Sequence, residues 1–226
     1  MVGIIGPNGA GKSTLIKTVM GLIEPEGGFV KIFDKEVEEV RDRIAYVPQR
    51  ESVDWDFPAS VLDVALMGLY DKEKWFQRYT KADKEMAKNC LDKVGMLSFS
   101  DRQISQLSGG QQQRVFLARA LARNADFYLM DEPFAGVDAT TETSILELLQ
   151  QMRNDGKTLL IVHHDLQTAH RYFDWFVLLN RRLIACGPRD EVFTDEKIQE
   201  TYGSRISIIE EISNQLGKEK LPTREF

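Results

Sequence analysis

Alternating strands and helices predict an α/β fold with a mostly parallel sheet. Short apolar runs typical of buried parallel strands lie at residues 2–5, 44–47, 127–130 and 159–162. A helical pattern separates the last two runs. The 226 residues, 42% hydrophobic and 28% charged, are enough for one large domain with a substantial apolar core. We therefore expect helices to cover both faces of the sheet.

The chain begins with a strand, a glycine-rich turn and a helix. Val2–Ile5 is an apolar run, Gly6–Gly11 interrupts it, and helical spacing of apolar residues continues over Ser13–Leu22. Two further strands are predicted, one around Phe29–Phe33 and one over Ile44–Val47.

The middle of the sequence has a different character. From Pro58 to about Val94 the pattern is helical, rich in charge, Met and Ala, and without strand-like runs. We expect three parts: a discontinuous core of residues 1–48 and 111–189, an inserted helical subdomain of residues 49–110, and a C-terminal helical tail of residues 190–226.

Strand patterns return in the second half of the chain. The predicted elements are a helix over Gln112–Arg123, a strand at Phe127–Met130, a helix at about Thr140–Arg153, a strand at Leu159–Val162, and a hairpin of Trp175–Leu179 and Leu183–Ala185.

Composition argues against several classes of protein. The net charge is −6, from 29 basic and 35 acidic residues, which disfavours binding to nucleic acid. Cys90 and Cys186 have neither redox nor zinc-site spacing. No apolar run approaches the roughly 20 residues of a membrane-spanning helix, and the first residues do not resemble a signal peptide. We expect a protein that stays in the cytosol and reaches a membrane only through a partner.

A phosphate-binding motif follows the first strand. It consists of Gly6, Pro7, Asn8, Gly9, Ala10, Gly11, Lys12 and Ser13, which match G-x-x-x-x-G-K-[ST] at every position. Glycines let backbone N–H groups approach phosphate oxygens, and the helix that starts near Lys12 directs its positive end at the same anion. Lys12 adds a charge for the β- and γ-phosphates, and the Ser13 hydroxyl can ligate Mg²⁺. The alternative is an ordinary glycine-rich turn, which the flanking strand and helix disfavour.

Two carboxylates end the strand that begins at Phe127. Asp131 lies at the carboxyl end, where doubly wound sheets bind ligands, and it suits Mg²⁺ coordination through water. Glu132 is next along the chain and suits a general base that polarises an attacking water. A solvated acidic pair is the alternative, and the phosphate motif elsewhere in the chain makes it the weaker one.

A second anion-binding device precedes the helix predicted from Gln112. Its residues are Leu107, Ser108, Gly109, Gly110 and Gln111. Free N–H groups, the helix dipole and a hydroxyl combine at such a helix start. The plainer interpretation is an N-cap with a flexible approach. A single domain already has one phosphate cradle, so a second one requires an explanation.

The order of these motifs resembles an ABC-type ATPase, a nucleotide-binding subunit. The resemblance includes Gln49 in Val-Pro-Gln, the LSGGQ sequence, the acidic strand end, and His164 in Val-His-His-Asp. It covers almost the entire chain. It implies a P-loop NTPase core of the RecA-like type, with an inserted helical subdomain. The stretches from Val47 to Tyr70 and from Leu107 to Ala122 further resemble ATPase subunits of manganese, zinc or iron importers.

The resemblance also implies a role for each motif residue. ATP and Mg²⁺ are the implied ligands. Residues that would hold the phosphates are Gly6, Pro7, Asn8, Gly9, Ala10, Gly11, Lys12, Ser13 and Thr14. Ser13, Asp131 and Gln49 would reach Mg²⁺, Glu132 would act as the base, and His164 would hydrogen-bond the γ-phosphate. His163 and His170 gain no role from it.

The second cradle is explained by a head-to-tail homodimer with ATP at both seams. Ser108, Gly109, Gly110 and Gln111 would then contact ATP bound to the other copy, and Asp138 would act across the same seam. The implied partners are integral-membrane permease subunits and, indirectly, an extracytoplasmic metal-binding protein. The implied location is the cytoplasmic face of the cell membrane. The apolar residues of 54–69 are either a groove for a permease helix or the core of the subdomain itself.

One departure from the family pattern stands at the start of the chain. Members normally have antiparallel strands and an adenine-stacking aromatic residue before the phosphate motif, whereas only five residues precede Gly6 here. We therefore expect a sheet without those strands. Other functions remain open: a soluble ABC ATPase acting on DNA or ribosomes, an importer for another substrate such as a metal chelate, and an inactive scaffold, which the retained motif residues disfavour.

Overall fold

A six-stranded sheet organises the fold in the computed structural model, which describes residues 1–70 and 78–203. The strand order is β2-β3-β4-β1-β5-β6. The strands are β1 (Val2–Ile5), β2 (Ile44–Val47), β3 (Phe127–Asp131), β4 (Thr158–Val162), β5 (Trp175–Asn180) and β6 (Arg182–Pro188). Neighbouring strands from β2 to β5 are parallel, and β6 is antiparallel to β5. The predicted mostly parallel sheet is therefore confirmed.

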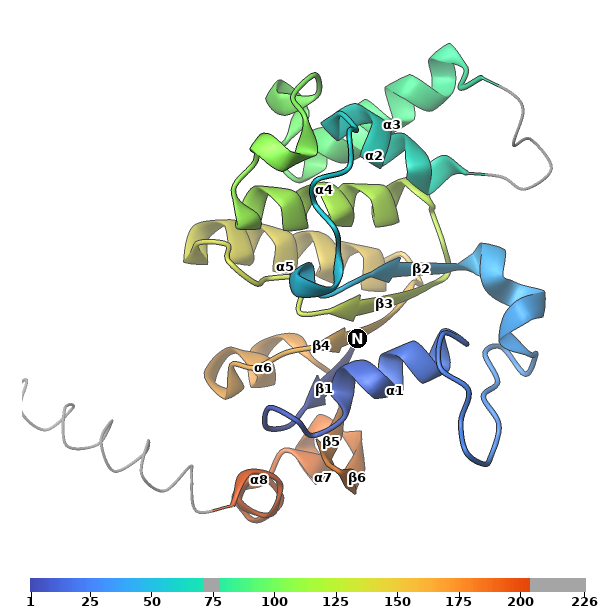
Figure 1. The fold of residues 1–226 in the computed structure, drawn as a ribbon. Helices are drawn as coiled ribbons and strands as arrows, with labels where there is room; N and C mark the ends of the chain where they lie inside the picture. The colour runs from blue at the N-terminus through green and yellow to red at the C-terminus, as the bar shows by residue number, and fades with distance from the viewer. Residues whose placement is uncertain (71–77, 204–226) are drawn as a thin grey trace, which may run out of the picture.

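Helices cover both faces of this sheet, with α1 on one side and α5 on the other (Figure 1). Their bounds are α1 (Lys12–Val19), α2 (Val61–Leu66), α3 (Lys81–Lys93), α4 (Gly109–Ala122), α5 (Ala139–Asn154), α6 (Leu166–Tyr172), α7 (Arg189–Val192) and α8 (Asp195–Tyr202). None of the helices in residues 1–70 and 78–203 is long and apolar enough to cross a bilayer.

Alternate strand residues build two apolar clusters, one on each face. Ile4 and Leu129 pack with Ile16 of α1, and all three side chains are fully buried. Ile5 and Met130, their chain neighbours, point to the opposite face and join the larger cluster beneath α4 and α5. Such alternation follows from the two-residue period of a strand. The strands are thereby fixed in register. The carboxyl ends of the parallel strands β1–β5 meet at one edge of the sheet.

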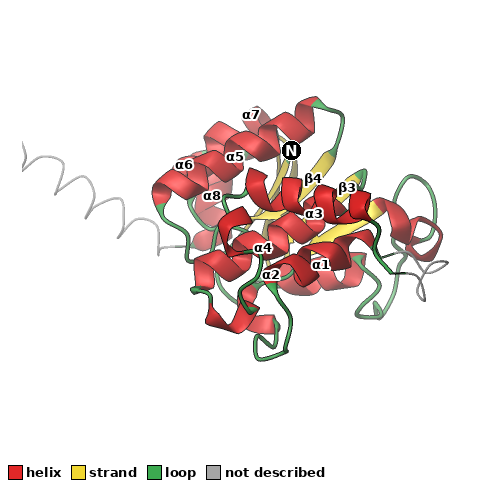
Figure 2. Ribbon diagram, turned by 90° about the horizontal axis from the view of Figure 1, so that it is seen from above, coloured by secondary structure: helices red, strands yellow, loops and turns green. Residues whose placement is uncertain are grey.

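Three helices pack together beyond the sheet, as Figure 2 shows for α2, α3 and α4. Both α2 and α3 begin with a capping box, formed by Ser60 with Asp63 and by Thr80 with Asp83. Trp55 packs edge-on against Phe116 of α4, with ring centroids 4.7 Å apart. The apolar residues of 54–69 thus contribute mainly to the core of this helical layer, although Met67 remains exposed.

The strand predicted around Phe29–Phe33 is wrong. The described structure has there only an isolated antiparallel bridge between Ile32 and Lys35, and the Phe29 side chain is 79% exposed. An apolar run becomes a strand only where another strand accepts its hydrogen bonds, and a two-residue bridge alone is marginal in water. Periodicity along the chain did not reveal that this partner is missing.

Two predicted helix ends also shift. The first helix ends at Val19, because Gly21 adopts a φ of 67° and the N–H of Leu22 bonds to the carbonyl of Lys17, which closes the helix. The helix predicted from Gln112 begins at Gly109, because Ser108 supplies its cap. Of the tail predicted over residues 190–226, only the part up to residue 203 lies within the described residues.

Candidate active site

The loop between β1 and α1 is shaped by close backbone approaches. Gly9 and Gly11 have positive φ values of 79° and 98°. A Cβ atom at Gly6 would lie 1.9 Å from the carbonyl oxygen of Leu179 in β5. Only glycine fits at that contact, so the loop can pass over the end of β5 and curl back toward α1. The backbone therefore forms a concave cradle at the carboxyl edge of the sheet.

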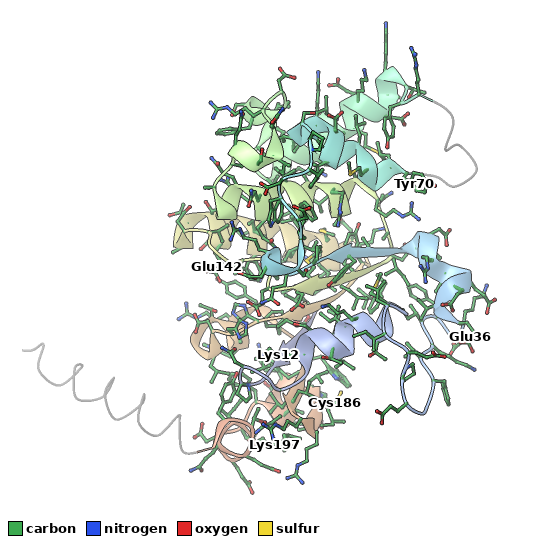
Figure 3. All side chains as sticks on the ribbon, in the orientation of Figure 1. Lys12, Glu36, Tyr70, Glu142, Cys186 and Lys197 are labelled. Carbon is green, nitrogen blue, oxygen red and sulfur yellow. The ribbon has the colours of Figure 1, made fainter. Side chains whose placement is uncertain are left out.

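Lys12 lies inside this cradle, at the start of α1 (Figure 3). Its side chain is buried, and Nζ donates to the carbonyl oxygens of Gly6 at 2.8 Å and Pro7 at 3.0 Å. Burial lowers the pKa of Lys12, and the negative charges of Glu132 and Asp131 oppose that shift. The ammonium is thus held at the loop, close to two carboxylates.

The first turn of α1 has no side-chain cap. Gly11 is the N-cap residue and offers no side-chain acceptor to the N–H groups behind it. These donors face a cavity of about 660 Å³. The cavity is lined by Asn8, Gly9, Ala10, Gly11, Lys12, Ser13, Thr14, Gln49, Glu132 and His164. A helix start with open N–H groups and a lysine binds anions, and phosphate fits this chemistry.

Asp131 ends β3 just behind the cavity. Its side chain is 1% exposed, and neither carboxylate oxygen has a hydrogen-bond partner in the described part of the chain. Burial raises the pKa of Asp131, while the nearby Ser13 hydroxyl and the charge of Lys12 act in the opposite direction. A buried carboxylate with unused oxygens beside a serine hydroxyl provides the hard oxygen ligands that Mg²⁺ prefers. These residues therefore fit a magnesium ion.

Glu132 is held at the mouth of the cavity by two side chains. Its Oε1 atom lies 2.6 Å from His164 Nε2 and accepts a 3.3 Å hydrogen bond from Gln49 Nε2. The contact with His164 lowers the pKa of Glu132, against the effect of burial. The residue also has a left-handed φ of 54°, which is unusual outside glycine and costs backbone energy. An ionised carboxylate is thus fixed in one place, facing the cradle of Lys12.

Comparison with known proteins identifies the family. A sequence model described as ABC transporter matches residues 1–135. The manganese transport system ATP-binding protein MntB of Bacillus subtilis is 61% identical over 211 residues, which is 93% of this chain and 84% of that protein. The zinc transport system ATP-binding protein TroB of Treponema pallidum is 57% identical over 90% of this chain and 77% of that protein. The chain belongs to the ABC transporter family. It is an ATP-hydrolysing subunit of that family.

Solved structures agree with this membership in the ABC family. A metal-chelate type ABC transporter in an inward-facing conformation matches with a TM-score of 0.75 and 26% identity, over 89% of this chain and 77% of that one. A dimeric ATP-binding cassette with ADP and phosphate, in a post-hydrolysis state, matches with a TM-score of 0.72 and 29% identity, over 83% and 84% of the two chains. The expected fold of an ABC ATPase is therefore confirmed.

The segment of this ABC ATPase that was predicted as a second anion-binding site, residues 107–111, does not line the cavity. Ser108 and Gln111 form a capping box: Ser108 Oγ accepts from Gln111 N at 3.4 Å, and Gln111 Oε1 accepts from Ser108 N at 2.9 Å. A Cβ atom at Gly110 would lie 2.3 Å from the carbonyl oxygen of Gly136, so the start of α4 packs tightly on the segment after β3. Ser108 is therefore an N-cap, as the plainer interpretation expected, and among the described residues the capping box uses its Oγ as an acceptor, so that the O–H can still donate.

Asp138 also lies apart from the cavity of the ABC ATPase. It is the N-cap of α5, where Oδ1 accepts from Thr141 N at 3.0 Å and Oδ2 from the Thr141 hydroxyl at 2.7 Å. The structure thus brings together the phosphate loop, Gln49, Glu132 and His164. It does not bring Ser108, Gly109, Gly110, Gln111 or Asp138 into the same cavity.

One buried polar residue near the site was missed in the sequence, and a second, His163, was expected to have no role. Gln113 of α4 is fully buried beside Glu132. It shares an apolar helix face with Phe116 and Leu117, and a polar residue on such a face is the signal that could have found it. His163 is 4% exposed, with Nε2 2.8 Å from Thr168 Oγ1. Burial lowers its pKa to about 4, so it is a neutral structural residue at physiological pH.

Proposed function

We propose that this chain hydrolyses ATP to energise an ABC importer of metal ions, with manganese, zinc or iron as cargo. The observation that carries the ATPase mechanism is the position of Glu132, held by His164 and Gln49 opposite Lys12 in one cavity. The cargo class is supported by the two relatives described as manganese and zinc transport subunits, which match at 61% and 57% identity.

The residues of the cavity divide the chemistry of phosphoryl transfer among them. The N–H groups of the loop and the ammonium of Lys12 bind and orient the phosphates. Ser13 and Asp131 would hold Mg²⁺, which supplies charge neutralisation at the phosphate oxygens when bound. Gln49 extends from the end of β2 toward the same place. The site therefore concentrates positive charge where the transition state develops negative charge.

Glu132 acts as the base that orients the attacking water. Because contact with His164 lowers its pKa, Glu132 is ionised at neutral pH and accepts a hydrogen bond from water. His164 keeps the carboxylate in place while no nucleotide is bound, and a γ-phosphate in the cavity gives the imidazole a second anionic partner. The strained backbone at Glu132 is consistent with a residue held for function.

The capped start of α4 acts on a second copy of the chain. Ser108, Gly110 and Asp138 lie outside their own cavity, so in a head-to-tail homodimer they would complete the cavity of the partner. The similar dimeric cassette with ADP and phosphate supports this arrangement. We assign residues 1–48 and 111–189 to the ATP-binding core and residues 49–110 to the helical subdomain.

A transporter also requires partners that this chain does not supply. The helical subdomain would contact integral-membrane permease subunits, and the dimer would sit at the cytoplasmic face of the membrane. An extracytoplasmic metal-binding protein would deliver the ion, so it would contact the permease and not this chain. No nucleic-acid partner is proposed, because the chain carries a net charge of −6.

Replacing Glu132 by Gln tests the catalytic assignment. Gln keeps the shape but loses the charge, so hydrolysis should fall by about 10² to 10⁴-fold while ATP binding is retained. Light scattering with saturating MgATP should then find a stable dimer. Glu147→Gln, on the exposed side of α5, is the matched control and should behave like the parent. Hydrolysis at the parental rate by Glu132→Gln would refute the role of Glu132, and a monomer would refute the dimer.

Cargo is tested separately, with the chain and its permease in sealed vesicles. ATP-dependent uptake of manganese or zinc should appear with the parent chain and be absent with Glu132→Gln. Stimulation of hydrolysis by DNA or ribosomes, without any metal uptake, would support the alternative of a soluble ABC ATPase.

A further inference from the structure

Gln113 connects two segments of the active site from a fully buried position. It lies on α4, and its side chain has 0% exposure. Its Nε2 donates to the carbonyl oxygen of Pro48 at 3.3 Å and to that of Glu132 at 3.4 Å. Its Oε1 is buried and has no hydrogen-bond partner among the described residues. An amide that keeps one unsatisfied atom in the interior carries a desolvation cost, so its position calls for a functional reason.

Both carbonyls belong to residues that determine where the catalytic carboxylate lies. Pro48 directly precedes Gln49, whose amide donates to Glu132 Oε1 at 3.3 Å. The carbonyl of Glu132 itself belongs to a residue with a strained, left-handed backbone. Besides the bond from Gln113, the carbonyl oxygen of Glu132 accepts one further hydrogen bond in the described structure, from the N–H of Ala135 at 3.1 Å. One side-chain amide therefore ties the backbone on both sides of the contact between Gln49 and Glu132.

We propose that Gln113 is a positioning residue for ATP hydrolysis, which sets the separation of Gln49 and Glu132. The inference rests on the proposed role of Glu132 as the base. Gln113 does not line the cavity, so it acts on the water-orienting carboxylate through the backbone and does not touch the nucleotide. A loss of its amide should therefore lower turnover and leave ATP affinity unchanged.

Gln112 offers a matched control on the same helix. It is also buried, at 4% exposure, and its Nε2 donates to the carbonyl oxygen of Ile104 at 3.2 Å. Its Oε1 accepts from Arg50 Nε at 3.2 Å. Neither contact involves Glu132. A variant at Gln112 therefore removes a comparable buried amide without releasing the catalytic carboxylate.

The experiment compares Gln113→Met with Gln112→Met in the intact chain, assembled with its permease. Met has a similar length and no amide, so both variants lose buried hydrogen bonds of the same kind. A displacement of about 1 Å at a catalytic group costs about 10²-fold in rate. We expect kcat to fall by about 10 to 100-fold for Gln113→Met, with the KM for ATP and directly measured ATP binding within twofold of the parent. Gln112→Met should keep kcat within about threefold.

Two further variants make every outcome informative. Adding Gln113→Met to Glu132→Gln should cause no further loss, because the base is already absent. If Gln113→Met does not fold, Gln113→Asn decides, since its shorter amide should lower kcat severalfold at unchanged ATP affinity. Equal kcat losses at positions 112 and 113, or a parental kcat for Gln113→Asn, would overturn the positioning role of Gln113 but leave the proposed function of the chain intact. A parental rate for Glu132→Gln would overturn the proposed function, and the inference with it.

Discussion

Two helices of this protein begin at glycine-rich segments, yet their N-termini are built differently. The N-cap of α1 is Gly11, which has no side chain, so the first N–H groups remain open toward a cavity of about 660 Å³. The N-cap of α4 is Ser108, whose capping box with Gln111 already satisfies two backbone donors. Among residues 1–70 and 78–203, the start of α1 thus has no side-chain cap, whereas the start of α4 is largely satisfied.

The difference explains why only the first N-terminus is a complete binding site. Beside α1 the chain places a buried lysine, the carboxylate of Glu132 and a histidine around a single cavity, and Asp131 is buried at the end of β3. Beside α4 the Ser108 O–H is left to donate, and Gly110 packs against Gly136. The α1 start therefore suits an anion by itself, whereas in the proposed dimer the α4 start would act on a phosphate bound to the second copy. Variants that change one helix start at a time separate the two contributions.

Replacing Lys12 by Ala should have the largest effect and should act on the α1 start alone. The variant removes a buried ammonium that the loop carbonyls hold at 2.8 and 3.0 Å. We expect ATP affinity and turnover each to fall by at least about 10²-fold, the scale of losing one preorganised charge at a phosphoryl-transfer site. Isothermal titration with ATP measures the affinity. Lys17→Ala, on the same helix but not in the lining of the cavity, should stay within about threefold of the parent.

The outcome separates binding from catalysis. Parental affinity in Lys12→Ala would show that the open N–H groups suffice for binding and that the ammonium of Lys12 contributes little to it. Because Lys12 donates its hydrogen bonds to the carbonyls of Gly6 and Pro7, the stability of the α4 cap should be unaffected in either case.

Near the α1 site a buried titratable residue, His163, makes the folding stability depend on pH, whereas the α4 cap of Ser108 and Gln111 has no titratable side chain. His163 follows β4, between the rings of Phe134 and Phe173, each 5.6 Å away. Burial lowers its pKa from 6.5 to about 4. The unfolded chain therefore takes up a proton near pH 6.5, whereas the folded chain takes it up only near pH 4, so stability is lost as the pH falls through that window. Between pH 7 and pH 5 this group should cost about 2 kcal/mol of unfolding free energy.

Urea unfolding at the two pH values measures that cost. His163→Gln should remove most of the difference, whereas His170→Gln, at an exposed position, should retain it. An unchanged pH dependence in His163→Gln would mean that other groups, such as the buried carboxyl of Asp131, govern the acid limit.

Local patterns in the sequence predicted most of the sheet. Runs of apolar residues predicted β1 and β2 with the bounds that the structure has, Val2–Ile5 and Ile44–Val47. β1 pairs with β4 and β5, and β2 pairs with β3 at the edge of the sheet, but most side chains of both strands are buried, so their burial is visible as continuous apolar character. The equally apolar run at Phe29–Phe33 failed because a strand also requires a neighbour, and the pattern of one segment carries no information about its neighbour.

The candidate site shows the same limit. The phosphate motif is contiguous, so its chemistry could be predicted from the residues themselves. The contact of Gln49 with Glu132 joins residues 83 positions apart and was not predicted; only the resemblance to a family assigned both residues to the ATP site. Gln113 was missed because its role depends on two main-chain carbonyls, and no residue type in the sequence indicates where a carbonyl will lie.

Ser108→Ala should have the smallest effect on folding and so measures the α4 cap alone. Loss of an N-cap hydroxyl costs about 1 kcal/mol, and the long 3.4 Å bond to Gln111 N suggests a value at or below that figure. Urea unfolding of the isolated chain gives the cost, with Ser144→Ala, whose hydroxyl bonds within α5, as the control. ATP affinity of the monomer should not change, while hydrolysis by the dimer should fall, since the proposed donor to the partner's phosphate is lost. A weaker monomer affinity for ATP would contradict the comparison, because it would place the α4 start in its own chain's binding site.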